Sequence, residues 1–217
     1  MTAAASARRA QLTPRAKKAV LAGVVVIVLA FVAFGTRVVP NDDESLQGVQ
    51  AFDAAVYGPE TFPAVAEAIE GRAVPAAELA AAIAADPAAA AEEYAVQSSG
   101  GPVYSTTLTG VVGEGASGIV ELDVEGLPDD LLVRVQLGPA INGTELRDAS
   151  GEIQFGQFTN QIEFQDAAAA INDTMKAEVL GGVDAAALAG STVTLTGAFT
   201  LINPQAWLIT PVEFEVA

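Results

Sequence analysis

The spacing of hydrophobic residues changes along this chain and divides it into segments of different kinds. Residues 19–36 form an uncharged apolar run. Residues 51–97 are rich in alanine, and their larger apolar residues recur at helical spacing. From residue 98 to residue 217, short stretches alternate apolar and polar residues, which is the period of a half-buried strand. The pattern therefore predicts a membrane segment, a helical section and a β-rich domain, in that order.

The apolar run predicts a transmembrane signal anchor, since a helix over 19–36 would span about 27 Å. The preceding residues, 1–18, carry a basic cluster and form a predicted cytoplasmic tail, so the rest of the chain is expected outside the cytoplasm. An acidic linker is predicted over 37–50. The alternative is a cleaved signal peptide, for which Ala33-Phe34-Gly35 offers a weak cleavage site. The length of the run favours the uncleaved, single-pass anchor.

Three helices are predicted in the alanine-rich section. They cover 62–70, a stretch that opens at 75, and 86–96. Gly71 ends the first helix, and Pro75 suits the first turn of the second, where Leu79 and Ile83 share one face. A section of this kind is more often packing material or a spacer than a functional site.

Strands are predicted over 104–112, 118–124, 131–137, 191–200 and 207–216. Glycine-rich residues 113–118 are expected to form the turn between the first two strands, and 126–130 the next turn. On the last strand, the alternate residues from Leu208 to Val216 are expected to share one face.

Between the third and fourth strands, a short strand over 152–158 and a helix over 166–180, capped by Asp166, are predicted. Three strands, a helix and two strands is the element order of an OB-type barrel. The predicted fold class is therefore α+β and mainly β: an OB-like five-stranded barrel over 98–217.

Composition and charge exclude several functions. The chain of 217 residues has neither cysteine nor histidine, which removes disulfides, thiolate metal sites, a cysteine nucleophile and a Ser-His-Asp triad. All 27 acidic residues follow Pro40, against four basic ones, a net charge of −23. Such a surface repels phosphate backbones, so no nucleic-acid partner is expected. No cofactor or metal is expected either, and the GEGASG string at 113–118 joins strands instead of opening a helix.

Candidate binding residues lie in the polar stretch 138–173. Arg147 beside Asp148 could hold a carboxylate or a sugar hydroxyl through forked hydrogen bonds. The alternative is an ion pair that fixes the fold. The amides of Asn160, Gln161 and Asn172 could bind a polar ligand or tie the loop to the barrel.

Three aromatic residues lie in the same stretch, namely Phe155, Phe158 and Phe164. They resemble a stacking platform for bases or sugar rings. At this spacing, however, a core position is the favoured interpretation.

A family resemblance rests on residues between 37 and 212. They are Arg37-Val38-Val39-Pro40, Gly138-Pro139, Ile141, Gly143-Thr144, Leu146-Arg147-Asp148, Ile153, Phe155, Phe158 to Phe164, Ala170-Ile171-Asn172, Thr196-Gly197-Ala198-Phe199 and Leu208 to Val212. With these residues the chain resembles a bacterial family of predicted periplasmic lipoproteins of unknown function.

The resemblance implies an OB-like fold, a place in the envelope and sugar ABC transporter components as partners, because genes of the family neighbour those of such transporters. It implies no reaction, so a membrane-anchored binding or accessory module is expected, not an enzyme. The chain departs from the family in having no cysteine for a lipid anchor, whose place the transmembrane anchor takes. The alternative function is a carboxylate-only hydrolase acting on glycans, with Glu152 and Glu163 as its acids.

Overall fold

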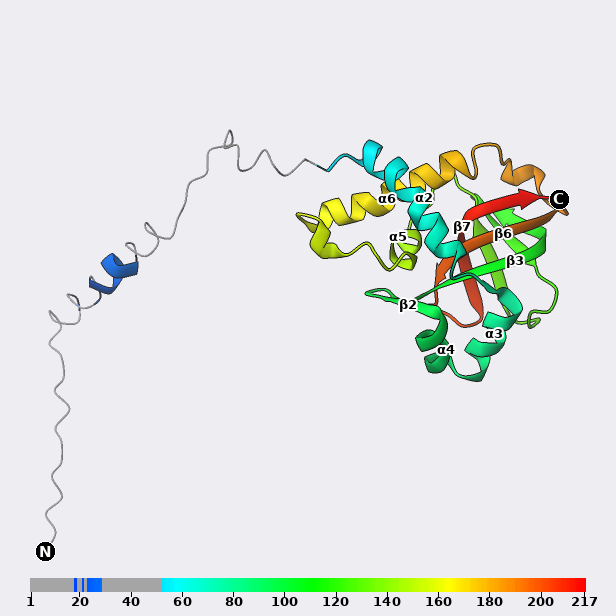
Figure 1. Ribbon diagram of the computed structural model, residues 1–217, viewed down its shortest axis with the longest axis horizontal. Coiled ribbons are helices and arrows are strands. Elements are labelled where there is room, and N and C mark those ends of the chain that lie inside the picture. The colour runs from blue at the N-terminus through cyan, green and yellow to red at the C-terminus, as the bar shows by residue number, and fades with distance from the viewer. Residues whose placement is uncertain (1–17, 19–20, 22, 29–51) are drawn as a thin grey trace, which may run out of the picture. The chain divides into compact units, whose positions relative to one another are not determined.

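Seven strands in one mixed sheet, with helices packed around it, make up the domain shown in Figure 1. The computed structural model describes residues 18, 21, 23–28 and 52–217. The helices are α2 (Ala54–Glu70), α3 (Ala76–Ala85), α4 (Pro87–Tyr94), α5 (Glu145–Ala149) and α6 (Gln161–Glu178), with 3-10 turns η1 (Phe155–Gln157) and η2 (Ala185–Ala187). The strands are β1 (Val74–Pro75), β2 (Ala95–Ser98), β3 (Gly101–Ala116), β4 (Ile119–Asp123), β5 (Leu132–Gln136), β6 (Thr192–Thr200) and β7 (Ala206–Val216).

Five of these strands form a closed ring of pairings. β3 pairs with β4, β4 with β5, β7 with β6, and β6 with β3, all antiparallel, while β5 and β7 pair in parallel. β3 closes the ring because it is long. It pairs with β4 near its C-terminal end and with β6 along most of its length. The domain is thus mixed α+β, with the strand order expected for an OB-like arrangement.

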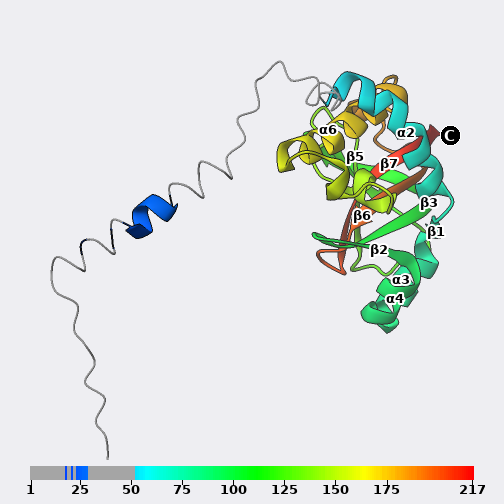
Figure 2. The same ribbon diagram turned by 60° about the vertical axis from the view of Figure 1, so that its left-hand side comes forward.

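The helices cover the ring at two places. In Figure 1 and Figure 2, α2 and α6 lie side by side, with α5 beside them, and α3 and α4 lie at the other end of the domain. Gly58 of α2 permits close packing on α6, since a Cβ there would lie 2.5 Å from the Ala170 carbonyl oxygen. Residues 52–217 form one compact unit.

A stack of three aromatic rings lies in the core. Tyr104, Phe199 and Trp207, from β3, β6 and β7, are at most 1% exposed. The Phe199 ring centroid lies 5.6 Å from that of Tyr104 and 4.6 Å from that of Trp207, and both pairs are stacked. Because β6 pairs with both β3 and β7, this stack joins three neighbouring strands of the ring.

Several predicted element boundaries are wrong. The first helix begins at Ala54, not 62, because Asp53 caps it by accepting a hydrogen bond from the Ala55 amide. The third ends at Tyr94, and Ala95–Ser98 form β2 instead, paired with β3. Pairing with β4 also carries β3 through 113–116, so the turn is only Ser117-Gly118.

The interval between β5 and β6 also differs from its prediction. The strand predicted over 152–158 is a 3-10 turn flanked by loop, and the short helix α5 precedes it. The long helix begins at Gln161, not 166, because Asn160 and not Asp166 caps it. It ends at Glu178, just before the predicted stop at Gly181-Gly182. The side-chain cap at Asn160 therefore decides where the long helix begins.

β7 changes the phase of its side chains at a bulge. Thr196 pairs with Glu213, whereas the next residue, Gly197, pairs with Pro211, which leaves Val212 as an extra residue. Before the bulge Trp207 and Ile209 are buried, contrary to the predicted alternate face from Leu208. Of the predicted face, Thr210 and Val212 are buried and Phe214 is half-buried, whereas Val216 is 50% exposed.

The predicted cytoplasmic tail, anchor and acidic linker lie almost wholly outside the described residues. Within 19–36, residues 21 and 23–28 are described, and they are helical. In the described part of the chain, no helix is both long and apolar enough to cross a bilayer.

Candidate functional site

The stretch 138–173, which carries all the predicted binding residues, folds into α5, η1 and the first part of α6. It packs on α2, and α5 also contacts β6. This stretch carries two groups of side chains: a buried ion pair, and a cluster of aromatic rings that contacts it.

Arg147 and Asp148 are brought together as an ion pair inside this stretch. The Arg147 Nε and Nη2 atoms both lie 2.8 Å from Asp148 Oδ1, and the two side chains are 5% and 9% exposed. Nη1 donates to the Phe164 carbonyl oxygen at 2.8 Å. The guanidinium carbon also lies 3.5 Å from the centre of the Phe164 ring. Arg147 thus joins α5 to α6, a geometry that favours the structural interpretation over ligand binding.

The other predicted amide residues have separate positions. Asn160 accepts hydrogen bonds from the amides of Ile162 and Glu163 as the cap of α6. Asn172 is buried and donates to the Gly143 carbonyl oxygen at 3.1 Å. Gln161 is exposed in the first turn of α6. The structure therefore gives Asn160 and Asn172 structural hydrogen bonds, and Asn160 and Gln161 are both exposed.

Five aromatic rings form a cluster at the N-terminal ends of α2 and α6. We call the set Phe52, Tyr57, Phe155, Phe158 and Phe164 the aromatic cluster. Its neighbouring ring centroids are 5.2–6.0 Å apart. Phe155 is 50% exposed, so the core interpretation is wrong for that ring, and the others are partly buried. Edge-on and tilted contacts of this kind hold a surface rigid while leaving ring faces open.

Sequence reasoning missed two members of the aromatic cluster. Phe52 and Tyr57 come from the start of the alanine-rich section, which was interpreted as packing or spacer. The available signal was the presence of two aromatic residues within one and a half helical turns in a stretch otherwise dominated by alanine.

Glu145 is a half-buried acid beside the ion pair. Burial raises the pKa of its carboxyl above the ordinary value, and the negative charge of Asp148 raises it further. The backbone amides of Glu145 and Thr144 oppose this shift. Since the folded pKa is raised, Glu145 contributes stability below about pH 4.5, and this contribution is lost as the pH rises through the folded pKa.

Glu145→Gln is therefore expected to raise the Tm at pH 7, because it removes a half-buried charge and keeps an acceptor for the backbone amides. Near pH 4, where the carboxyl of the unchanged protein is largely protonated, the two Tm values should converge. Thermal unfolding followed by circular dichroism at both pH values measures this. Glu125→Gln, at an exposed acid, serves as the control and should show no such difference. An unchanged Tm at pH 7 would contradict the prediction.

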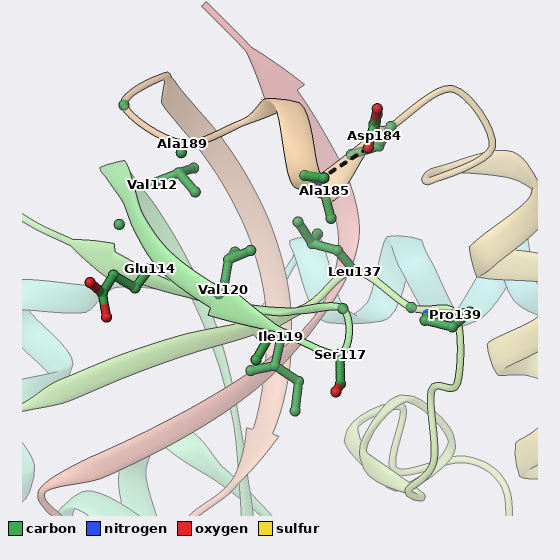
Figure 3. Close-up of a pocket in the computed structure, with 18 residues that line it drawn as sticks. Val112, Glu114, Ser117, Ile119, Val120, Leu137, Pro139, Asp184, Ala185 and Ala189 are labelled. Carbon is green, nitrogen blue, oxygen red and sulfur yellow. Dashed lines mark hydrogen bonds between the residues drawn. The ribbon is translucent and has the colours of Figure 1, made fainter.

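A groove lies at the hairpin that joins β3 and β4. It has a volume of about 1000 Å³ and is lined by residues of the hairpin, by 137–139, by 183–186 and by 189–190. No group of three or more acidic side chains that could hold a metal ion occurs within the described residues. The groove is lined mostly by apolar residues and glycines, as Figure 3 shows. It therefore offers apolar contacts and backbone hydrogen-bonding groups, and few side chains for acid–base chemistry.

Comparison with known proteins identifies the family of this chain and finds a protein of similar fold. The sequence profile of a family described as "Predicted periplasmic lipoprotein (DUF2291)" matches residues 24–215. A crystal structure of an OB-fold protein from Thermotoga maritima is similar, with a TM-score of 0.60 and 20% sequence identity, over 77% of this chain and 100% of that one. No match is found among curated proteins. The structural likeness concerns the fold alone.

Proposed function

Because this chain belongs to the family of predicted periplasmic lipoproteins, DUF2291, whose function is unknown, we propose that it is a membrane-tethered accessory module outside the cytoplasm. Its partner is a component of a sugar ABC transporter, and the surface that meets this partner is the aromatic cluster. The tether is the N-terminal apolar run, with the N-terminus in the cytoplasm.

The observation that carries this proposal is the partial exposure of the aromatic cluster. Exposed apolar groups that lie together on a soluble domain mark interaction sites more often than chance exposure does. Phe155 is 50% exposed, and Ile162, in the first turn of α6, is 69% exposed. Aromatic anchors are also the side chains that contribute most to binding at protein interfaces.

The place of the cluster along the chain supports a role near the membrane. Phe52, the first residue of the folded unit, belongs to the cluster, so the segment that leads from the apolar run arrives there. In sequence, the aromatic cluster thus begins at the residue that directly follows the N-terminal unit.

The hydrolase alternative gains no support from this arrangement. Glu163 is occupied as a helix cap, since its Oε2 accepts a hydrogen bond from the Thr159 amide at 2.9 Å. Glu152 lies exposed in the loop after α5. A glycosidase needs two free carboxylates at a fixed separation, and here one of the two proposed acids has a structural role.

Phe155→Asp tests the proposed surface. It places a charge in the most exposed ring position of the aromatic cluster, so binding of the permease or substrate-binding subunit of a sugar ABC transporter should fall at least tenfold. Quantitative co-purification from cross-linked cells measures this. Stability should change by only about 0.5 kcal/mol, as for other exposed positions.

Ile202→Asp is the matched control, because Ile202 is 87% exposed in the loop between β6 and β7, outside the aromatic cluster. It should leave co-purification unchanged. Equal recovery of the transporter subunit with Phe155→Asp and with the unchanged protein would remove the aromatic cluster as the partner surface.

A further inference from the structure

One short segment of β3 lacks a partner on one edge. One edge of β3 pairs successively with β2, β1 and β4, while the other pairs with β6. The pairing with β6 reaches Val111, and Val112 adds two bonds, its amide to Ser191 O at 2.9 Å and its carbonyl from the Gly190 amide at 2.8 Å. Beyond this point, within the described residues, Gly115 and Ala116 pair with β4 alone, and Gly113 and Glu114 lie at an irregularity of the pairing with β4.

The groove runs beside this free edge. Its far wall consists of residues 183–186 and 189–190, which include the first two residues of η2. Figure 3 shows Val120 and Leu137 at its floor, with Ala185 and Ala189 on the side of η2. The volume, about 1000 Å³, is ample for several residues of extended chain.

The hairpin that carries the free edge is fixed in place. Ser117 and Gly118 have φ angles of 56° and 79°, as in the two-residue turns that suit a twisted hairpin. Gly118 packs on the backbone of Gly138, since a Cβ on it would overlap the Gly138 carbonyl oxygen, and its own carbonyl accepts from the Leu137 amide at 2.7 Å. The groove is therefore preformed, with no need for the hairpin to close on a ligand.

The residues of the free edge leave their backbone accessible. Gly113, Gly115 and Ala116 have little or no side chain, and all of Gly113–Ala116 are exposed. Proteins usually protect such an edge with bulky or charged side chains or with a covering segment. Here only Glu114 is charged. These four residues span about 13 Å, and the irregularity at Gly113 and Glu114 leaves Gly115 and Ala116 as the regular part of the edge.

Charge selects among the strands that could add to this edge. The two ionisable residues that line the groove are Glu114 and Asp184, both acidic. They lie on opposite sides of it in Figure 3. A second copy of the chain is disfavoured, because edge-to-edge pairing would bring the Glu114 carboxylates of two strongly acidic domains together.

We propose that this groove binds an extended peptide segment of a partner protein, which adds as a strand to Gly113–Ala116 and places basic side chains near Glu114 and Asp184. Backbone hydrogen bonds to the free edge supply the binding, and alternate apolar side chains of the peptide enter the floor at Val120 and Leu137. The GEGASG string at 113–118 thus has a role in protein recognition and none in phosphate binding.

Binding of a labelled six-residue peptide that alternates lysine and valine to the full-length chain tests the proposal. Fluorescence anisotropy should give a Kd in the micromolar range. Two further versions of this peptide carry N-methyl groups on alternate backbone amides, one on the odd residues and one on the even residues. The version whose methyl groups lie on the edge that pairs with β3 should bind at least tenfold more weakly. A peptide with glutamate in place of lysine should also bind at least tenfold more weakly.

Two protein variants localise the site. Ala189→Trp fills the side of the groove and should weaken lysine–valine peptide binding at least tenfold, whereas Ala187→Trp, on an exposed residue of η2 outside the groove, should not. Three results would each overturn the proposal. They are no binding up to millimolar peptide, equal binding of the parent peptide and both methylated peptides, and equal effects of the two tryptophan substitutions. Phe155→Asp should leave peptide binding unchanged, so a failure here is separate from a failure of the aromatic cluster as partner surface.

Discussion

Arg147→Ala is expected to lower the free energy of unfolding by about 3–5 kcal/mol, because it leaves Asp148 as a buried charge without its partner. The substitution also removes the hydrogen bond to the Phe164 carbonyl and the stacking on the Phe164 ring. For a unit of this size, the loss corresponds to a fall in Tm on the order of 10 °C. Urea unfolding of the full-length chain at pH 7 measures the free energy directly.

Two companion variants separate the ion pair from the stacking. Arg147→Lys keeps the charge but cannot reproduce the fork on Asp148 Oδ1 or the planar contact with Phe164, so an intermediate loss is expected. In the double variant Arg147→Ala with Asp148→Asn, much of the loss should be recovered, because no unpaired charge is left. A stability that is unchanged by Arg147→Ala would instead return this residue to the group of ligand-binding candidates.

Phe199→Ala is expected to cost about 3–5 kcal/mol, because it deletes the middle ring of the stack in the core and leaves a cavity between the other two. The side chain is 0% exposed and contacts Tyr104 and Trp207. The fluorescence of Trp207, the only tryptophan of the chain, should change in the folded state as its stacking partner disappears. Denaturant unfolding followed by this fluorescence gives both results in one experiment.

Phe155→Ala provides the matched control for the core substitution. It removes the same atoms from a ring that is 50% exposed, so its cost should be a small fraction of that of Phe199→Ala. Similar costs for the two variants would mean that the stack contributes little beyond ordinary surface contacts, and that the ring of strands is held mainly by its hydrogen bonds.

Prediction from sequence succeeded where the signal was local. The alternation of Val120 with Leu122, and of Val133 with Val135, places these side chains in the core, as the structure shows. Leu79 and Ile83 are buried on one face of α3 for the same reason. Periodicity reports which face of an element is apolar, and it fails where an element changes phase, as β7 does at Val212.

The candidate site was only partly predictable. The density of polar and aromatic residues in 138–173 predicts a candidate site in this stretch, but it does not predict which contacts its members make. Phe52 and Tyr57 lie about a hundred residues before the phenylalanines that they contact. Contacts over such a separation are decided by how α2 packs on α6, and no local spacing records that.

The sequence by itself determined the order and type of the main elements, the acidity of the folded unit and the exclusion of cysteine and histidine chemistry, because each depends on residue type and short-range spacing alone. The tertiary structure decided three other properties: the closure of the ring through β3 and β6, the burial of Arg147 against Asp148, and the free edge at Gly113–Ala116. All three follow from which distant segments meet. A strand has the same alternation whether its edge is paired or free, and an arginine is the same residue whether it faces water or Phe164.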